Sequence, residues 1–408
     1  MRCRHCHAPV NLPLMDLGSS PPSNAYLSDS ALAAAERWYP LRVFVCTACW
    51  LVQTEDYAHV SELFASDYAY FSSVSTSWLD HAERYVDEVV RRFDLGPSSR
   101  IVEIACNDGY LLQYVRKRGL ACLGVEPTAA TARAARDKGI PVIERFFGLE
   151  LAGEMVRDGN AADLVVANNV LAHVPDIGDF VAGVTRLLKP GGVATFEFPS
   201  LVNLVELCQF DTIYHEHFSY LSLTTVSRLF EGNGLRIFDV QEHPTHGGSL
   251  RVFACRSDGG IRPVGNLVGE LRMREMRAGV CSEAFYAGFQ PRADRIKDNL
   301  LAFLIKTKRD GKRVGAYGAA AKGNTLLNYA GVRKDLLPWV VDRNPAKVGR
   351  YLPGCRIPIV TEERLHVEQP DFVLILPWNL RAEIATQLSQ VRAWGGKFVT
   401  AVPELEIF

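Results

Sequence analysis

Short apolar runs alternate with longer amphipathic segments through the middle of the chain, from about residue 99 onward. The runs RIVEIA, LACLGVE, ADLVVANN and GGVATFEFP are separated by stretches whose apolar residues recur at helical spacing. Strands that alternate with helices in this way are typical of a parallel, doubly wound sheet. The pattern therefore predicts an α/β domain here, preceded by a helix over residues 77–93.

The same rhythm starts again in the last hundred residues, where KRVGAYG, PWVVD, DFVLIL and GKFVTAV are the apolar runs. This repeat predicts a second, smaller Rossmann-like unit. Between the two units, GLRIFDVQEH and GSLRVFACRSDG predict two antiparallel strands that end the first sheet. Charged and apolar residues then alternate at helical spacing over residues 265–308, which predicts a helical connector.

Four of the ten cysteines form two C-x-x-C pairs, Cys3 with Cys6 and Cys46 with Cys49. Two such pairs supply the four thiolates of a tetrahedral zinc site. Two disulfides are the alternative, but a reducing cytoplasm disfavours them. We therefore expect structural Zn²⁺ held by all four cysteines, with the flanking histidines as bystanders. Four protein ligands leave no open position on the metal, so we expect it to take no part in catalysis.

A chain of 408 residues is longer than one hydrophobic core usually organises. The patterns divide it into a zinc-binding domain over residues 1–66, the larger α/β domain over 67–258, and the connector with the smaller unit over 259–408. The Pro, Ser and Gly-rich segment between the cysteine pairs has little periodicity, so the first domain depends on its metal for a stable fold.

Composition and charge exclude several classes of protein. The chain is 48% hydrophobic and 22% charged, and it has no apolar run long enough to span a bilayer. The formal net charge of -1 gives no general attraction to nucleic acid or to an anionic membrane. The start, MRCRHCHAPV, has no apolar core of a secretory signal. We expect a monomeric cytoplasmic protein that binds neither nucleic acid nor a membrane.

The first strand of the large domain ends in the turn ACNDG, residues 105–109, and the second strand ends at Glu126. Ligands of doubly wound sheets bind at the carboxyl ends of the strands, where an acid after strand two commonly holds a ribose diol. The turn is not the G-x-G-x-x-G of dinucleotide sites. It therefore favours a ligand without a pyrophosphate.

The segments VEIACNDGYLL, GVEP, ANNVLAHVPD and LLKPGGVATFEFP resemble those of class I S-adenosylmethionine-dependent methyltransferases. With the cysteine pairs and the blocks SDYAYFSSVSTSW, FDTIYHEHFSYLS and GAYGAAAKGNTLLNYAG, the whole chain resembles the sugar C-methyltransferases of antibiotic pathways. YHEHFSYLS is the most distinctive block. The resemblance implies S-adenosylmethionine as methyl donor and C-3 of a dTDP-linked 4-keto-deoxysugar as the position that is methylated.

The resemblance also implies the donor site. The amino-acid end of the donor would lie over the glycine turn, its ribose would meet the acid after strand two, and residues after strand four would face the acceptor. Carried across by position, the donor-binding residues are Glu103, Ala105, Asn107, Gly109, Glu126, Asn168 and Asn169. The turn departs from the broad superfamily at Cys106-Asn107, where Gly-x-Gly is common.

The segment DTIYHEHF, residues 211–218, packs titratable groups between apolar flanks. Carbon methylation beside a ketone needs a base for the acidified C–H and a donor to the enolate oxygen. The resemblance implies His217 as the base, Tyr214 and Glu216 as positioning groups for the substrate or enolate, and His173 as a contact to the same ring. An extended segment would place Tyr214 and Glu216 on one face and the histidines on the other, whereas a turn would bring them together.

Two glycine-containing loops are candidate acceptor sites. HGGSLR, residues 246–251, offers Ser and Arg to a hydroxyl or phosphate, with an ordinary hairpin and a surface Arg as the alternative. GAYGAAAKGN, residues 315–324, lies between a strand and a helix, where N–H groups and a lysine can meet a phosphate of the nucleotide. The residues expected to bind the acceptor are Tyr68, Tyr70, Phe71, His246, Ser249, Arg251, Gly318, Lys322 and Asn324.

Several other functions remain open at this point. The closest is O-methylation of the same acceptor class. The others are a noncatalytic nucleotide-sugar or RNA-binding module and a dehydrogenase, although GAYGAAAKG departs from the dinucleotide fingerprint. A metal held by the histidines around residue 216 is disfavoured, because hard cations prefer several carboxylates and the segment supplies only Asp211 and Glu216.

Overall fold

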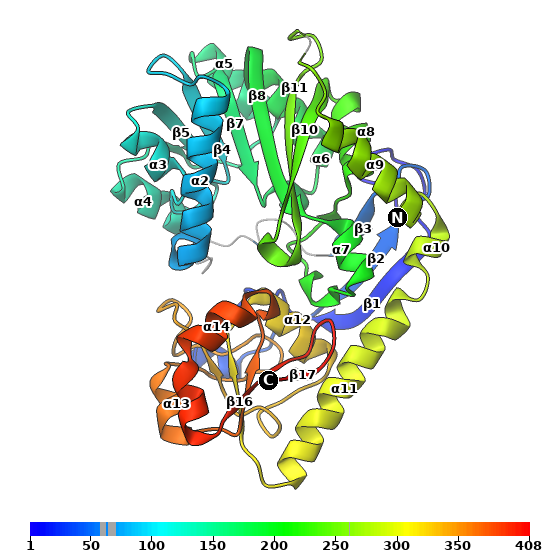
Figure 1. The fold of residues 1–408 in the computed structure, drawn as a ribbon, viewed down its shortest axis with the longest axis vertical. Helices are drawn as coiled ribbons and strands as arrows, with labels where there is room; N and C mark the ends of the chain where they lie inside the picture. Colours follow the sequence, from blue (N-terminus) through cyan, green and yellow to red (C-terminus); the bar gives the residue numbers. More distant parts are fainter. Residues whose placement is uncertain (58–62, 64–70, 261) are drawn as a thin grey trace.

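The computed structural model describes residues 1–57, 63, 71–260 and 262–408, and they form three β-sheets with their helices. Figure 1 shows the central sheet in the upper half, the C-terminal sheet in the lower half, and the N-terminal strands beside both. A small N-terminal sheet, a doubly wound central sheet and a smaller Rossmann-like sheet therefore confirm the α/β architecture predicted from the sequence.

The N-terminal sheet has the order β1-β2-β3-β9, and its strands pair antiparallel. The strands are β1 (Leu12–Ser20), β2 (Tyr39–Val45), β3 (Val52–Thr54) and β9 (Ser219–Tyr220). The last of these comes from the chain segment directly after the predicted catalytic block. The N-terminal module is therefore completed by residues that lie far along the sequence.

The central sheet has the order β10-β11-β8-β7-β4-β5-β6. Its parallel strands are β4 (Arg100–Ile104), β5 (Ala121–Val125), β6 (Val142–Ile143), β7 (Ala162–Asn168) and β8 (Leu188–Pro199). The edge is the antiparallel pair β10 (Leu235–His243) and β11 (Ser249–Arg256). The predicted strand alternation and the antiparallel end of the sheet are both confirmed.

Two layers of helices cover the central sheet because successive residues of its strands point to opposite faces. Ile101 packs with the layer formed by α2, α3 and α4, and Val102 packs with the layer formed by α5, α6 and α8. The helices are α2 (Thr76–Arg92), α3 (Leu112–Lys117), α4 (Ala129–Asp137), α5 (Leu149–Arg157), α6 (Ile177–Leu187), α7 (Leu201–Glu206) and α8 (Leu223–Gly232). The predicted helix over residues 77–93 corresponds to α2, whose first turn is capped by Ser75.

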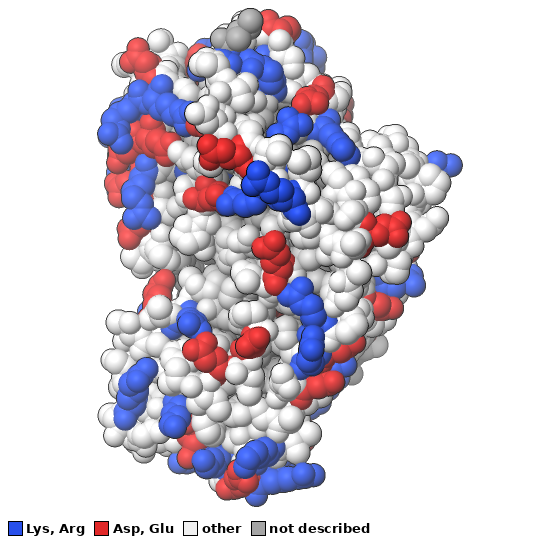
Figure 2. All heavy atoms as spheres, turned by 45° about the vertical axis from the view of Figure 1, so that its right-hand side comes forward, with Lys and Arg blue, Asp and Glu red and all other residues white. Residues whose placement is uncertain are grey.

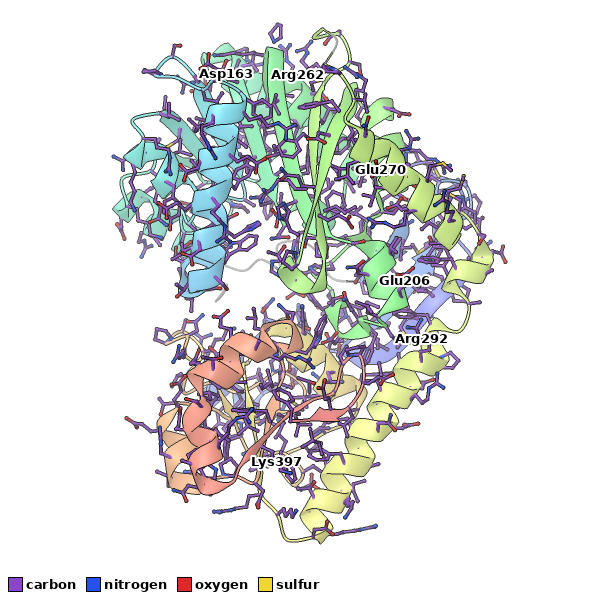
Figure 3. All side chains as sticks on the ribbon, in the orientation of Figure 1. Asp163, Glu206, Arg262, Glu270, Arg292 and Lys397 are labelled. Atoms are coloured by element: carbon purple, nitrogen blue, oxygen red, sulfur yellow. The ribbon has the colours of Figure 1, made fainter. Side chains whose placement is uncertain are left out.

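Three helices connect the central sheet to the C-terminal one: α9 (Asn266–Ala278), α10 (Glu283–Tyr286) and α11 (Phe289–Arg309). Arg292 on α11 donates to the carbonyl oxygens of Val205 and Glu206 at the end of α7, which fixes the long helix against the central domain (Figure 3). No helix among the described residues is long and apolar enough to cross a bilayer.

The C-terminal sheet has the order β14-β13-β12-β15-β16-β17, parallel except for its last strand. Its strands are β12 (Val314–Tyr317), β13 (Val340–Val341), β14 (Ile359–Val360), β15 (Phe372–Ile375), β16 (Lys397–Thr400) and β17 (Glu406–Ile407). Its helices are α12 (Ala321–Tyr329), α13 (Glu363–Glu368) and α14 (Arg381–Gln387).

One hydrophobic core joins the N-terminal strands, residues 201–220 and the C-terminal sheet. Polar contacts reinforce this junction: Tyr26 donates to the Ala319 carbonyl oxygen at 2.7 Å, and Thr325 donates to the Ile213 carbonyl oxygen at 2.9 Å. Acidic and basic side chains are interspersed on the face of the molecule shown in Figure 2. The three parts thus pack as one body with a cavity between its two α/β sheets.

Candidate active site

A cavity of about 1170 Å³ lies between the carboxyl ends of the central strands and the C-terminal sheet. Its wall includes the glycine turn after β4, the ends of β5 and β7, the first turn of α2, the loop before β11 and the start of α12. Ligands of doubly wound sheets bind at this edge, and a volume of this size exceeds what one small molecule needs. The cavity has room for two small molecules together.

The turn after β4 enters the left-handed backbone region at three residues. Ala105, Asn107 and Gly109 have φ angles of 57°, 49° and 76°. A Cβ on Gly109 would lie 2.3 Å from Ile140 Cδ1, so the turn approaches its neighbours too closely for a side chain there. Ala105 and Asn107 line the cavity, whereas Gly109 shapes the turn from behind.

Glu126 lies at the end of β5 on the cavity wall, as the strand pattern predicts. Its Oε2 accepts the Asn107 backbone N–H at 3.0 Å, and its Oε1 accepts the Thr128 backbone N–H at 3.0 Å. The Thr128 hydroxyl also donates to Oε1, so three of the roughly four hydrogen bonds that a carboxylate can accept are made within the protein, and about one remains for a ligand hydroxyl. The site therefore suits a hydroxyl of a bound ligand.

Glu103 lies under the turn and does not line the cavity. It therefore does not contact a bound ligand directly, although the sequence placed it among the binding residues. Its side chain is buried, both carboxylate oxygens have no hydrogen-bond partner among the described residues, and burial raises the pKa of this carboxyl well above its usual value. Asn168 and Asn169, at the end of β7, do line the cavity. The Asn169 backbone N–H donates to the Glu197 carbonyl oxygen at 2.7 Å.

The imidazole of His217 lies on the cavity wall against the ring of Tyr214, with 3.9 Å between their centroids. His217 Nδ1–H donates to the Thr212 carbonyl oxygen at 2.8 Å, which leaves Nε2 as the atom with the lone pair. Burial, followed by the neighbouring His173, lowers the pKa of His217 well below its usual value. The ring is therefore neutral at pH 7, in the form that accepts a proton.

His173 lies 4.6 Å from His217, measured between ring centroids, and donates from Nδ1 to the Glu216 carbonyl oxygen at 2.7 Å. Burial lowers the pKa of His173 to about 4, so it too is neutral. Carbonyl oxygens of the same segment, those of Thr212 and Glu216, therefore hold both imidazoles.

The block around His217 is a turn, so the face assignment for an extended strand is wrong. Tyr214 and His217 face the cavity together, whereas His215 and Glu216 point toward the N-terminal module. Glu216 Oε1 accepts the backbone and side-chain N–H groups of Asn24 at 3.3 and 3.1 Å, Oε2 has no partner among the described residues, and burial raises the pKa of this carboxyl.

The sulfur atoms of Cys3, Cys6, Cys46 and Cys49 lie within 4.8 Å of one another, and no other such cluster occurs among the described parts of the chain. The Cys3–Cys49 and Cys6–Cys46 sulfur distances are both 3.5 Å, far longer than the roughly 2.05 Å of a disulfide. Zinc–sulfur bonds of about 2.3 Å place tetrahedral sulfurs about 3.8 Å apart. The four thiolates therefore fit a structural zinc ion.

Three domain families match the chain: a zinc binding domain over residues 3–64, a methyltransferase domain over 78–240 and a C-methyltransferase C-terminal domain over 244–403. C-methyltransferase NovU from Streptomyces niveus is 36% identical over 404 residues, which cover 98% of this chain and 95% of that protein. The chain belongs to the C-methyltransferase family. Its fold is that of an S-adenosylmethionine-dependent enzyme with an N-terminal zinc-binding module.

Other relatives match only part of this C-methyltransferase. A ubiquinone biosynthesis O-methyltransferase from Rhodopseudomonas palustris is 26% identical over 152 residues, which cover 31% of this chain and 59% of that protein. The structure of the magnesium protoporphyrin IX methyltransferase of Synechocystis matches at 16% identity and a TM-score of 0.34. The match covers 44% of this chain and 79% of that protein. No functional conclusion rests on these partial likenesses.

On the acceptor side of the C-methyltransferase, Lys322 lines the cavity at the start of α12. Its Nζ donates to Asn379 Oδ1 at 2.9 Å and to the His246 carbonyl oxygen at 3.4 Å, and it lies 4.6 Å from the centre of the Trp378 ring. Burial lowers the pKa of Lys322 to about 8, against the opposing charge of Asp211. The lysine remains mostly protonated at pH 7 and can neutralise an anion.

Two other expected acceptor residues of the same loop do not line the cavity. Gly318 has a φ of 90°, and a Cβ there would lie 2.4 Å from Pro377 Cδ, so it permits the turn. Asn324 is buried and donates to the Ser23 carbonyl oxygen at 2.8 Å, which ties α12 to the N-terminal module. Phe71 lines the cavity, and Tyr68 and Tyr70 lie outside the described residues.

Three charged residues that follow β13 also line the cavity: Asp342, Arg343 and Lys347. Asp342 accepts the backbone N–H groups of Ala319 and Asn344 at 2.7 and 2.8 Å. Lys347 donates to the Ala319 carbonyl oxygen at 2.8 Å. The glycine loop after β12 is thus held by Asp342, and a cation lies beside it.

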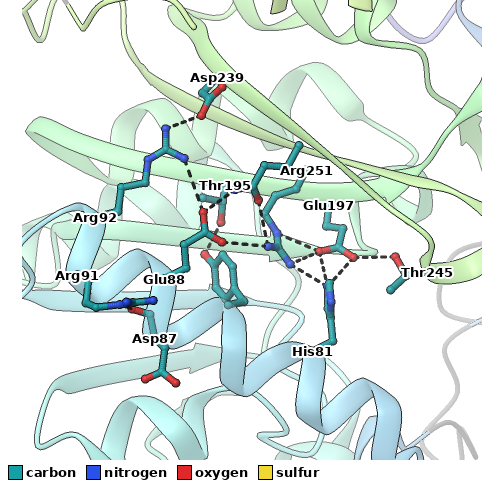
Figure 4. Close-up of polar contacts among 12 residues, drawn as sticks. His81, Asp87, Glu88, Arg91, Arg92, Thr195, Glu197, Asp239, Thr245 and Arg251 are labelled. Carbon is teal, nitrogen blue, oxygen red and sulfur yellow. Dashed lines mark hydrogen bonds and ion pairs between the residues drawn. The ribbon is translucent and has the colours of Figure 1, made fainter. Parts of the chain in front are cut away.

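Arg251 is buried in an ion pair, so it is neither a surface residue nor an open phosphate ligand. Its Nη2 and Nε lie 2.6 and 3.0 Å from Glu197 Oε2, and His81 Nε2 donates to the same carboxylate at 2.9 Å (Figure 4). Burial opposes ionisation of Glu197, but His81 and Arg251 outweigh it and lower its pKa to about 2. Ser249 is likewise buried and donates to the Thr245 carbonyl oxygen.

Trp78 and His81 line the cavity although the sequence did not single them out, and Glu197 supports His81 from behind the wall. Trp78 lies within about 6 Å of three cavity rings, those of His81, Tyr110 and His246. A signal was present in the sequence, because His81 falls on the buried stripe of the amphipathic helix. A histidine on an otherwise apolar face requires a polar partner.

Proposed function

We propose that this C-methyltransferase uses S-adenosylmethionine to methylate C-3 of a dTDP-linked 4-keto-deoxysugar in the formation of an unusual antibiotic sugar. The observation that carries the proposal is the position of His217. This neutral imidazole lines the large cavity between the central and C-terminal sheets and keeps its lone pair on Nε2. A base in such a cavity suits proton removal beside a ketone, because the carbonyl makes that C–H acidic.

In the proposed reaction, His217 Nε2 takes the proton from C-3, and the C–H electron pair becomes the C-3–C-4 double bond of an enolate. When bound, S-adenosylmethionine supplies the methyl group, which the enolate carbon attacks as the C–S bond breaks, leaving S-adenosylhomocysteine. The Thr212 carbonyl holds the imidazole in the correct tautomer and stabilises the imidazolium that forms. The imidazolium then loses its proton to solvent.

Other residues of the segment orient the substrate. Tyr214 packs on His217 and faces the cavity, where its hydroxyl is our candidate contact to the sugar ring or its enolate oxygen. His173 would contact the same ring. We place Glu216 as a positioning residue, because it holds Asn24 rather than the cavity contents.

The two ends of the cavity suit the two substrates. Glu126, Asn107 and Asn168 would hold the methyl donor, and the turn after β4 leaves room for its amino-acid end. Lys322 and Lys347 would neutralise the diphosphate of the nucleotide sugar beside the loop after β12. The zinc ion would hold the fold, since four cysteine ligands leave it no position for a substrate.

The fate of the C-3 hydrogen tests the reaction. Substrate deuterated at C-3 should lose its label in the methylated product, and His217→Asn should lower kcat by about 10²–10⁴ with intact donor and dTDP binding. Retention of the label would exclude C-3 methylation and favour O-methylation. Loss of the label with normal turnover of His217→Asn would keep the reaction and move the base to another cavity residue.

A further inference from the structure

Two imidazoles of the cavity are held in the same tautomer, with the proton on Nδ1, but the protein engages Nδ1 of one ring and Nε2 of the other. His217 donates from Nδ1 to a carbonyl oxygen and therefore keeps its lone pair on Nε2. His246 Nε2 lies 3.2 Å from the side-chain nitrogen of Asn169, which is a donor, so His246 Nε2 accepts and its proton is on Nδ1. One ring can thus take a proton while the other can donate a hydrogen bond.

The orientation of His246 is fixed by its surroundings. Its φ of 56° lies in the left-handed region, and a Cβ on the next residue, Gly247, would come within 2.5 Å of the Trp378 ring. The preceding Thr245 donates to Glu197 Oε1 at 3.1 Å, which anchors the loop to the buried ion pair (Figure 4). The ring therefore stands in a rigid wall rather than on a mobile loop.

The same surroundings keep His246 neutral. Burial, followed by the nearby charge of Lys322, lowers the pKa of His246 to about 4. Both His246 and Lys322 also contribute to the lowered pKa of His217, which places the three groups within electrostatic reach of one another. Among the described residues, no hydrogen bond engages His246 Nδ1.

We propose that His246 is a further catalytic residue, whose Nδ1–H donates a hydrogen bond to the substrate carbonyl oxygen as His217 removes the C-3 proton. This role rests on the proposed function, because only an enolate needs such a donor. His246 loses no proton in the step. It stabilises the negative charge that moves onto oxygen, as a neutral imidazole does in enolising enzymes, with Lys322 adding a positive field.

Asn169 acquires a role through His246. Its side-chain N–H fixes which nitrogen of the imidazole carries the proton, and its own backbone is fixed by the Glu197 carbonyl. Asn169 is therefore a positioning residue. Asn169→Asp replaces the donating N–H by an accepting oxygen, so it should move the His246 proton from Nδ1 to Nε2.

A matched pair of substitutions tests the donor. Asn and Asp have the same shape, both tolerate a positive φ, and only Asn offers an N–H near the position of Nδ1. Loss of one donor to an oxyanion costs about 10²–10³ in kcat. With the C-3-deuterated dTDP-4-keto-deoxysugar, we expect His246→Asn to keep kcat within about tenfold of wild type. In His246→Asp, kcat should fall by about 10²–10³. The KM for the nucleotide sugar should change little in either variant.

The outcomes separate the two proposals. If the label is lost but His246→Asp turns over as fast as His246→Asn, the donor role is wrong and the reaction stands. If the label is retained, the reaction is wrong and the donor role falls with it. Zinc content and donor affinity of both variants control for folding.

Imidazole ¹⁵N resonances of the wild-type holoenzyme test the tautomer without any measurement of activity. The signals that disappear in His246→Asn should show a protonated Nδ1 and an unprotonated Nε2, and Asn169→Asp should exchange that pattern. A protonated Nε2 in the wild type would overturn the proposal.

Discussion

Replacement of Glu197 by Gln should destabilise the protein strongly, because it leaves the buried guanidinium of Arg251 with only the partly exposed carboxylate of Glu88, 3.9 Å away, as a counter-charge. The Arg251 side chain is 2% exposed, that of Glu197 is 0% exposed, and the shortest distance between them is 2.6 Å. His81 donates to the same carboxylate, and the guanidinium also lies 4.4 Å from the centre of the Tyr85 ring (Figure 4). Gln keeps the shape of Glu197 and removes only the charge.

Two routes give a similar magnitude. The pKa of Glu197 falls from the usual 4.5 to about 2, a shift worth about 3 kcal/mol of stability at pH 7. Breaking a buried ion pair by removal of one partner typically costs about 3–5 kcal/mol. We therefore expect Glu197→Gln to lower the free energy of unfolding by about 3–5 kcal/mol at pH 7.

The assay is denaturant unfolding followed by tryptophan fluorescence and circular dichroism. The matched control is Glu242→Gln, which breaks the exposed pair with Arg274 and should cost less than about 1 kcal/mol. A Glu197→Leu/Arg251→Met double variant should recover most of the loss, because it leaves no buried charge.

The pH dependence has a definite sign. Because its pKa is depressed in the folded state, Glu197 contributes its full stabilisation above pH 4.5 and loses it progressively as the pH falls toward 2. The difference in the free energy of unfolding between wild type and Glu197→Gln should therefore decrease as the solution is acidified below pH 4.5. If Glu197→Gln costs no more than Glu242→Gln at pH 7, the ion pair is solvated and the reasoning is wrong.

Three other predictions concern the metal, the donor and the packing of the central sheet. Metal analysis after mild purification should find one zinc per chain, and less than half an equivalent would contradict the site. Cys46→Ser should lose the metal and lower the melting temperature. Calorimetric titration should show that Glu126→Ala binds S-adenosylmethionine more weakly by about 1.5–3 kcal/mol, and unchanged affinity would remove the ribose assignment. Gly124→Ala should cost about 1–3 kcal/mol of stability, because its Cβ would lie 2.4 Å from Cys106 Sγ. A Cys106→Ala background should relieve that cost.

The periodicity of the chain was sufficient to predict the central sheet because neighbouring strand positions face different helix layers. Ile101 and Val102 are both buried, in different cores, so the strand reads as a continuous apolar run between helical patterns. The pairing of β3 with Ser219–Tyr220 had no such signal. A two-residue strand carries no period, and its partner lies more than 160 residues away in the sequence.

The sequence could point to individual residues of the cavity, but it could not give their geometry. The sequence identified His217 and Tyr214, and only the turn geometry shows that Glu216 faces away from them. Arg251 had the appearance of a ligand or surface residue because its partner, Glu197, stands 54 residues earlier on another strand. Charge pairs between distant residues become visible only when the strand register is known.

The short strand β9 makes the catalytic loop part of the zinc module's own sheet. The Phe218 carbonyl accepts the Thr54 backbone N–H at 3.2 Å, while the Phe218 N–H donates to the Ala172 carbonyl at 2.8 Å, next to His173. Thr54 Oγ1 also donates to the His217 carbonyl at 3.3 Å. A chimera that exchanges only the N-terminal module between two such enzymes would therefore also replace the support of His217, the proposed base. Successful grafts must carry the zinc-binding module, which matches its domain family over residues 3–64, and the segment from Asp211 to Tyr220 as one inherited unit.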